Sequence, residues 1–95
     1  MEFIWDENKR RKVLAAHKID FLKIQDIFDD PFAFYFEDFE HSGETEIRRA
    51  IVGKTSFYGL IVLIFIYEDE QIKFITARRA EKWMVNEYED QRNRF

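Results

Sequence analysis

Two pairs of adjacent arginines are the residues in this chain whose type and spacing could do chemistry. They are Arg48-Arg49 and Arg78-Arg79. A guanidinium group binds phosphate through two parallel, charge-assisted hydrogen bonds, and it stays charged at every relevant pH. If adjacent strands present one arginine of each pair on the same surface of a sheet, that surface can hold a phosphodiester. It can also stabilise the pentavalent transition state of that phosphodiester.

Proton-transfer groups lie close to the first pair in the sequence. Glu46 and His41 are near enough to Arg48 to be candidates for general acid–base catalysis. The alternative is structural, because arginines at strand ends also pair with Glu and Asp side chains across a sheet. Spacing alone favours this ion-pair interpretation over the catalytic one.

Strand periodicity predicts where the second arginine pair points. Successive side chains of a regular strand point to opposite faces, so Arg78 is expected on the face of Phe74 and Arg79 on the face of Ile75. The two arginines should therefore not share one role. One is expected to meet phosphate, and the other to support the fold or the far side of the substrate.

Other catalytic chemistries have little support in the sequence. There is no cysteine, and the two histidines, His17 and His41, lie on different predicted elements without metal-ligand spacing. No serine lies in a nucleophile elbow, and no glycine pattern matches a dinucleotide or P-loop site. Neither a metal nor a cofactor is predicted.

Three large aromatic residues could stack on RNA bases, namely Trp5, Trp83 and Tyr88. At helical or strand spacing such residues more often belong to the core, and we favour the core interpretation. His17 is likewise expected to be a semi-buried histidine, in an apolar stripe of its helix that also contains Val13 and Leu14.

The composition predicts one domain over residues 1–95 with an ample core, since 46% of the residues are hydrophobic and 18% are aromatic. The net charge of −4 is unevenly distributed: residues 19–46 contain one lysine and nine acidic residues, a net of −8, which leaves +4 elsewhere. Nucleic acid could therefore bind only at a local basic patch. No signal peptide or membrane segment is expected, and a cytoplasmic protein is predicted.

The apolar run 60–67 organises the predicted elements, because its β-branched and aromatic residues are typical of a central strand covered on both faces. An acidic turn at 68–70 and an alternating segment from 71 complete a hairpin that ends at the second arginine pair. Further strands are predicted at 2–5, 32–37 and 45–52, with a turn over 53–59. Helices are predicted at 6–18, 20–29 and from 80 onward, with Asp6 and Asp20 as N-caps.

The resulting order β-α-α-β-β-β-β-α predicts an α+β fold. We expect an antiparallel sheet with two N-terminal helices and one C-terminal helix packed on it. Two ways of covering the central strand remain open. The N-terminal helices cover one face and the C-terminal helix covers the other, or a partner covers one of the faces, and we favour some contribution from a partner.

Several motifs, in this order and with this spacing, resemble the BrnT toxin family. They span nearly the whole chain, and the Trp-Asp opening and the Ala-Arg-Arg-Ala close are the most specific. The matching residues are Trp5-Asp6, Lys9, His17, Phe21, Ile27-Phe28-Asp29-Asp30-Pro31, His41-Ser42, Arg48, Gly53-Lys54-Thr55, Ala77-Arg78-Arg79-Ala80 and Tyr88.

The resemblance implies a RelE-like fold and an endoribonuclease toxin that cleaves RNA without metal, by attack of the 2′-hydroxyl on the adjacent phosphate. By position, Arg48, Arg78 and Arg79 would stabilise the scissile phosphate. Glu46 and His41 would be the candidates for proton transfer. The implied partner is a BrnA-like antitoxin with a ribbon-helix-helix domain, and operator DNA would be bound only through it. The resemblance also allows a homodimer of the toxin within the complex.

The chain departs from the usual pattern of that family in and after its first helix. Val13, Ala16 and Lys18 stand where Asn, Lys and Gly are usual, and Met84 replaces a commonly acidic residue. Without glycine, Lys18 must take a left-handed conformation or the helix must be capped differently. These departures, with the acidic 19–46 segment, leave a second hypothesis. It is a non-catalytic toxin-fold module that docks an antitoxin and takes part in operon autoregulation.

Overall fold

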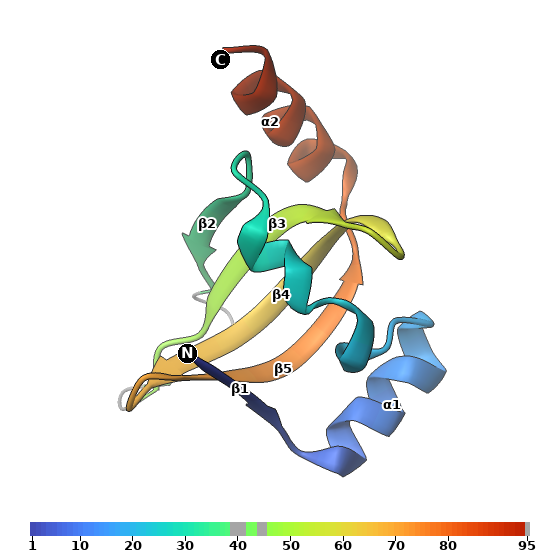
Figure 1. Ribbon diagram of the computed structural model, residues 1–95, viewed down its shortest axis with the longest axis vertical. Coiled ribbons are helices and arrows are strands. Elements are labelled where there is room, and N and C mark those ends of the chain that lie inside the picture. Colours follow the sequence, from blue (N-terminus) through green and yellow to red (C-terminus); the bar gives the residue numbers. More distant parts are fainter. Residues whose placement is uncertain (39–41, 44–45, 95) are drawn as a thin grey trace.

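The apolar run 60–67 forms most of β4, the middle strand of a five-stranded sheet, in a computed structural model that describes residues 1–38, 42–43 and 46–94. Helical segments lie on both sides of this sheet (Figure 1). In chain order the elements are β1 (Glu2–Trp5), α1 (Glu7–His17), η1 (Phe21–Lys23), η2 (Gln25–Asp29), β2 (Phe34–Glu37), β3 (Arg49–Thr55), β4 (Gly59–Glu68), β5 (Gln71–Arg79) and α2 (Lys82–Asn93).

The strand order is β1-β5-β4-β3-β2, and the four strands from β2 to β5 pair antiparallel. The α+β class is therefore confirmed. The predicted antiparallel sheet is confirmed for these four strands, and β1 is the exception, because it pairs parallel with β5. No tight turn sets the direction of β1, whose partner strand lies in the other half of the chain. Its position is fixed by packing, since Phe3 and Trp5 lie against the ring of Phe74.

Both predicted N-caps of the N-terminal segment are confirmed. The Asp6 carboxylate accepts hydrogen bonds from the backbone N–H groups of Asn8 and Lys9, and Asp20 accepts one from Leu22. The first helix ends at Lys18, whose φ of 61° places it in the left-handed region. Of the two solutions expected where glycine is missing, the chain therefore adopts the left-handed conformation at Lys18.

The second predicted helix, 20–29, is not an α-helix but two short 3₁₀ helices, η1 and η2, that meet at Ile24. Phe21, Ile24 and Ile27 are fully buried. Their spacing of three residues matches the three residues per turn of a 3₁₀ helix rather than the 3.6 of an α-helix. Burial of this row against the sheet therefore decides the helix type.

The predicted apolar stripe of α1 is only partly correct. Val13 is buried, but Leu14 and His17 are exposed. Helix α1 contacts mainly β5, near one edge of the sheet, so a narrow row of its residues is covered. His17 is a surface residue, and the expectation of a semi-buried histidine was wrong.

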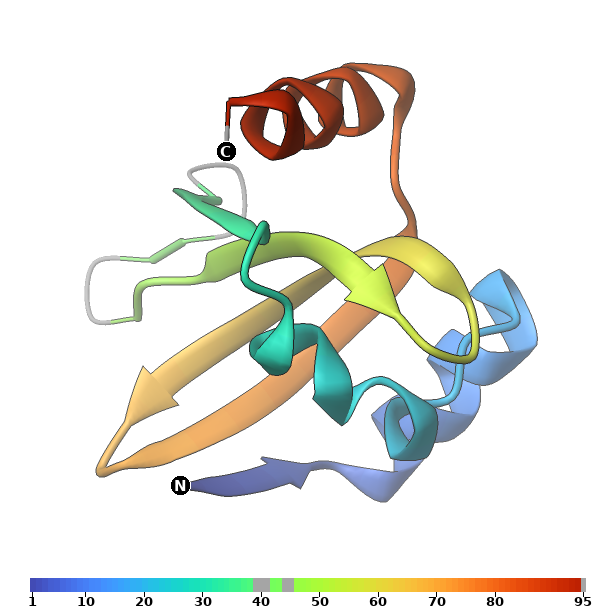
Figure 2. The ribbon, with the colours of Figure 1, turned by 45° about the horizontal axis from the view of Figure 1, so that its top comes forward.

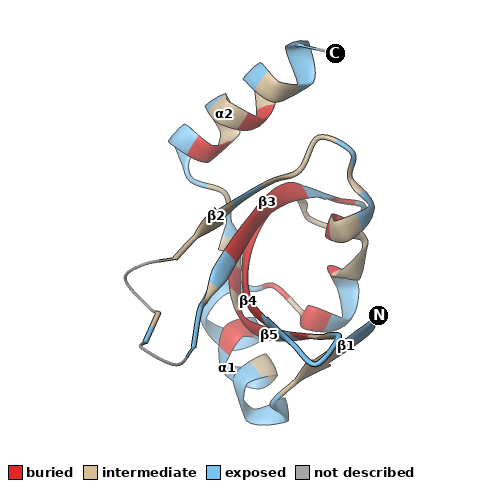
Figure 3. Ribbon diagram, turned by 90° about the vertical axis from the view of Figure 1, so that its left-hand side faces the viewer, coloured by how far each residue is buried: buried red, intermediate tan, exposed pale blue. Residues whose placement is uncertain are grey.

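Two apolar cores, one on each face of the sheet, bury the middle of β4 (Figure 3). We name the faces after the helices that cover them. The core of the α1 face, covered by α1, η1 and η2, contains Val13, Ile19, Phe21, Ile24, Ile27, Ile51, Ile61, Leu63, Phe65, Ile72, Phe74 and Ala77. The core of the α2 face contains Ala50, Val52, Val62, Ile64, Ile66, Ile75 and Met84, with Phe34, Phe36 and Ala80 packed against it.

The chain's own elements are thus sufficient to bury the middle of the central strand, and the contribution from a partner that we favoured is not needed for it. Helix α2 lies over the sheet on the side opposite the η helices (Figure 2). Two departures from the BrnT-like pattern, Val13 and Met84, are buried in these cores and so concern packing. Among the described residues, no helix is long and apolar enough to cross a membrane.

Candidate functional site

A β-bulge in β5 determines which way the second arginine pair points. In the β4–β5 register Ile64 pairs with Thr76 and Phe65 with Phe74, so Ile75 is the extra residue. Phe74 belongs to the core of the α1 face and Ile75 to that of the α2 face. The alternation expected for a regular strand is therefore reversed beyond this point.

The bulge corrects the predicted companions of the two arginines but leaves their opposition intact. Arg78 pairs with Val62, a residue of the α2-face core, and Arg79 pairs with Ile61 of the α1-face core. Arg78 therefore lies on the face of Ile75 and not on that of Phe74. Because the pair is split between the two faces, the two guanidinium groups meet different surroundings.

Arg78 opens onto a groove of about 380 Å³ between α2 and the sheet. Its Nη1 donates a hydrogen bond of 2.7 Å to Glu81 Oε1 in the link before α2. The other carboxylate oxygen of Glu81 accepts a bond of 2.8 Å from Trp83 Nε1. The groove has an apolar floor and a polar rim, and its lining residues are Phe36, Glu37, Asp38, Val62, Ile64, Thr76, Arg78, Glu81, Trp83 and Met84.

Arg79 has a different environment on the α1 face. Its Nη1 donates a 2.8 Å hydrogen bond to the carbonyl oxygen of Tyr58, and its guanidinium carbon lies 5.7 Å from the centre of the Tyr58 ring. Tyr58 in turn accepts a hydrogen bond on its hydroxyl from the backbone N–H of Asp20. Arg79 thus joins the end of β5 to the β3–β4 turn and, through it, to η1.

Arg48 and Glu46 are brought together, with a distance of 3.3 Å between Arg48 Nε and Glu46 Oε1. The backbone of Arg48 is held from both sides, because its N–H donates to Ser42 Oγ and its carbonyl accepts from the N–H of Asp38. Arg48 directly precedes β3, and the alternation of Ala50 and Val52 places it toward the α2 face. His41 lies outside the described residues.

Arg48 and Arg78 share a face but do not converge. Arg49 pairs with Phe65 and Arg78 with Val62, so Arg48 lies four residues further along β4 than Arg78. At the usual strand dimensions this separates the two Cα atoms by about 13 Å along the strands and about 10 Å across them. The two arginines therefore lie apart on the α2 face and do not form one cluster.

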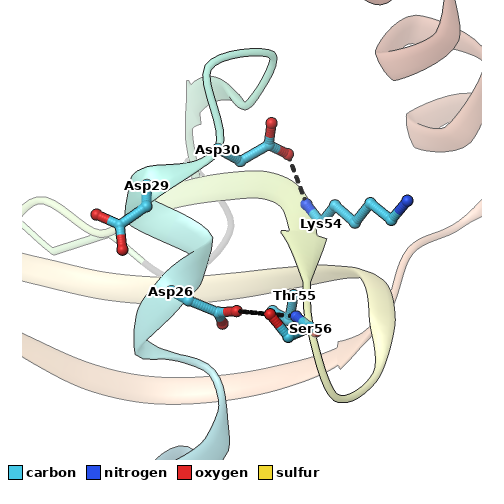
Figure 4. Close-up of a pocket in the computed structure, with 6 residues that line it drawn as sticks. All are labelled: Asp26, Asp29, Asp30, Lys54, Thr55 and Ser56. Atoms are coloured by element: carbon cyan, nitrogen blue, oxygen red, sulfur yellow. Dashed lines mark hydrogen bonds between the residues drawn. The ribbon is translucent and has the colours of Figure 1, made fainter.

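A second group of motif residues forms a structural joint and not a reactive site. The pocket in Figure 4 has a volume of about 430 Å³ and is lined by Asp26, Asp29, Asp30, Lys54, Thr55 and Ser56. Asp30 Oδ2 accepts from the backbone N–H of Lys54 at 2.7 Å, and the side chain of Lys54 points away from it. Asp26 Oδ2 accepts from both the N–H and the hydroxyl of Ser56.

Gly53 and Tyr88 belong to the same joint. A Cβ atom at Gly53 would lie 2.8 Å from Ile27 Cγ1, so only glycine lets β3 pass this close to η2. Residues 53–55 belong to β3, although a turn was predicted to begin at Gly53. The hydroxyl of Tyr88 donates a 2.8 Å hydrogen bond to Asp30 Oδ2. Burial, reinforced by this bond, raises the pKa of Tyr88 to about 12.

The three aromatic residues considered for base stacking differ in burial. Trp5 packs against Phe21 and Phe74, and Tyr88 is buried, so the core interpretation is confirmed for both. Trp83 is 50% exposed and lines the groove, so that interpretation was wrong for it.

Sequence reasoning missed Glu81 altogether. The sequence signals available were its position three residues after Arg78 and the four-residue spacing of Met84 and Tyr88. Burial of Met84 and Tyr88 turns Trp83 toward the groove. Within the described part of the chain, no group of three or more His, Asp or Glu side chains is arranged to hold a metal ion.

Comparisons with known proteins agree with the motifs. A family model described as ribonuclease toxin, BrnT, of type II toxin–antitoxin system matches residues 5–83. The crystal structure of the Brucella abortus ribonuclease toxin, BrnT, superposes with a TM-score of 0.66 at 27% sequence identity, covering 86% of this chain and 99% of that chain. No curated protein sequence matches the chain.

Proposed function

Because the chain belongs to the family of ribonuclease toxins, BrnT, of type II toxin–antitoxin systems, we propose that it cleaves RNA without a metal ion, using its arginines to stabilise the scissile phosphate. Membership of this family implies endoribonuclease activity and a cognate antitoxin. The α+β fold, shared with the Brucella abortus toxin, is RelE-like. The roles of this chain's own residues in RNA cleavage are the part that we propose.

The proposed reaction is an internal transesterification of RNA. The ribose 2′-oxygen forms a bond to the adjacent phosphorus, and the bond from that phosphorus to the 5′-oxygen of the next nucleotide breaks. A base removes the proton of the 2′-hydroxyl, and an acid protonates the leaving 5′-oxygen. Arg78 neutralises the negative charge that develops on the phosphate oxygens. Glu46 and His41 remain the candidates for proton transfer, and Arg48 holds a neighbouring phosphate.

The observation that carries this proposal is the position of Arg78. Its guanidinium reaches into a groove on the α2 face, whereas the adjacent Arg79 is on the opposite face and bonded to a backbone carbonyl. A phosphate can approach Arg78 from solvent, because the arginine side chain is 40% exposed. Arg79 is exposed as well, so we assign phosphate binding to Arg78 because it lines the groove, and support of the fold to Arg79 because it donates to the Tyr58 carbonyl.

For the partner we propose a BrnA-like antitoxin with a ribbon-helix-helix domain, through which alone operator DNA is bound. Residues 19–46 have a net charge of −8 from one lysine and nine acidic residues, and this charge is complementary to a basic part of that antitoxin. The complex allows a homodimer of the toxin.

Expression in bacteria tests the activity. Induction of the wild-type chain is expected to arrest growth and deplete cellular RNA, and co-expression of the product of the neighbouring gene should relieve both effects. Arg78→Ala, shown to be folded by its thermal unfolding, should be tolerated. Unchanged growth and intact RNA after induction of soluble wild-type protein would count against the proposal.

One observation favours the alternative, a non-catalytic module that docks the antitoxin and takes part in operon autoregulation. Arg48 and Arg78 do not converge on one phosphate, and each is paired with a carboxylate, Glu46 and Glu81 respectively. Under this alternative, purified protein captures the neighbouring gene product in a pull-down yet leaves RNA intact. Failure of that pull-down would remove the alternative's main support.

A further inference from the structure

One carboxylate holds both side chains at the open end of the groove. Glu81 Oε1 lies 2.7 Å from Arg78 Nη1, and Glu81 Oε2 lies 2.8 Å from Trp83 Nε1. To a guanidinium, a carboxylate and a phosphate offer the same pair of anionic oxygens. Glu81 therefore occupies one of the donor nitrogens of Arg78 that a phosphate of RNA would use.

This internal pair is of the kind that another anion can displace. The Arg78 and Glu81 side chains are 40% and 49% exposed, and ion pairs this accessible to water contribute little to stability. RNA brings several phosphates at once and gains from the release of counterions. RNA therefore competes for Arg78 through several contacts at once, in a groove that Glu37 and Asp38 also line.

Trp83 has an open surface beside that phosphate position. Its ring rests on Phe34 and Phe36, with centroid distances of 6.4 and 5.4 Å, and half of the residue remains exposed. Both ring contacts are tilted, at 54° and 58°, and a half-exposed indole is suited to stack against a base. The groove volume of about 380 Å³ lies within the range of small-molecule sites.

We propose that Arg78, Glu81 and Trp83 form a nucleotide subsite, in which Arg78 binds a phosphate, Trp83 stacks on the neighbouring base, and the Glu81 carboxylate is the occupant that RNA displaces. This inference rests on the proposed function and adds the substrate class. Since a base must leave its helical stack to lie on Trp83, the substrate is single-stranded RNA. Glu81 is a positioning residue in this scheme and takes no part in bond breaking.

Binding to an RNA that cannot be cleaved tests the subsite separately from catalysis. The probe is a fluorescein-labelled, single-stranded hexanucleotide with a 2′-O-methyl group on every ribose, which lacks the attacking hydroxyl. Fluorescence anisotropy gives the Kd for the wild type and each variant. Thermal unfolding confirms that each variant is folded.

Trp83→Leu keeps an apolar side chain on the two phenylalanines but removes the stacking surface, and it should weaken binding about tenfold. Trp83→Phe keeps a ring and should bind close to the wild type. Glu81→Gln removes the competing charge and should tighten binding about two- to fivefold. The matched control is Asp90→Asn, which removes one exposed carboxylate elsewhere on α2 and should leave Kd near the wild-type value.

The outcomes separate this inference from the function on which it rests. If Arg78→Ala weakens binding while Trp83→Leu and Glu81→Gln behave as wild type, the subsite is wrong and the proposed function stands. Weaker binding of Trp83→Leu without tighter binding of Glu81→Gln would overturn the role given to the carboxylate. If the wild type neither binds the probe nor cleaves RNA, both proposals fail.

Discussion

Lys18 takes a left-handed backbone conformation that usually requires glycine, and this costs conformational energy. A side chain with a Cβ is strained in the left-handed region by about 1–2 kcal/mol, yet Lys18 adopts a φ of 61° at the end of α1. Part of the strain is offset, because its backbone N–H donates to the carbonyl of Leu14 and its Nζ to that of Ala15. The strain is local and removable.

Lys18→Gly should therefore stabilise the protein. Glycine adopts the left-handed conformation without strain, and after the larger entropy loss of glycine on folding we expect a gain of about 0.5–1 kcal/mol in the free energy of unfolding. Such a gain corresponds to a rise in Tm of roughly 2–8 °C for a domain of this size.

The control is Lys18→Ala, which loses the same lysine contacts but keeps a Cβ atom, and it should not stabilise. Thermal unfolding of the three proteins gives the answer. A Tm for Lys18→Gly at or below that of Lys18→Ala would show that the left-handed backbone is not the source of strain.

At the scale of elements, the most important unit is the joint centred on Asp30. Its two carboxylate oxygens accept from the backbone N–H groups of Phe32 and Lys54 and from the hydroxyl of Tyr88. The bonds tie the segment after η2 to β3 and to α2. Because α2 also carries Trp83 into the groove, this joint helps to position the α2 face.

Tyr88→Phe removes one bond of the joint and should lower the free energy of unfolding by about 1–2 kcal/mol at pH 7. Urea denaturation measures the loss. Tyr67→Phe, at an exposed tyrosine on β4, is the matched control and should be neutral.

The loss should shrink at high pH. The pKa of Tyr88 is raised from 10.0 to about 12 in the folded protein. A raised pKa contributes stability that is fully present below the unfolded value and is lost as pH rises from 10 toward 12. Phenylalanine has nothing to ionise, so the difference in the free energy of unfolding between the two proteins should shrink as the pH rises through this window. A constant difference between pH 7 and pH 11 would contradict the raised pKa.

Element order, the central strand and both acidic caps could be predicted because each rests on a local pattern. The position of the bulge could not, since Phe74 and Ile75 are both apolar and either can face a core. The parallel pairing of β1 depends on contacts with the far half of the chain. Glu81 was missed because its role depends on where α2 turns Trp83, which no single pattern encodes.

At the scale of the whole molecule, the sheet places the two adjacent arginines, Arg78 and Arg79, in different surroundings. The α1 face is covered by α1, η1 and η2 and contains Arg79 in a structural contact. The α2 face is covered by one helix and keeps a groove with Arg78 at its rim. Two arginines that are neighbours in sequence are therefore opposite in environment, which is an internal control for the assignment of the RNA site.

The most direct test compares RNA cleavage by Arg78→Ala and Arg79→Ala, with the purified proteins in the presence of a metal chelator. Loss of the charge at the scissile phosphate should slow cleavage by Arg78→Ala about 10²–10³-fold with its Tm preserved. Arg79→Ala should lose about 1 kcal/mol of stability and cleave at close to the wild-type rate while folded. Equal loss of activity in both variants, or full activity in Arg78→Ala, would contradict an RNA site on the α2 face.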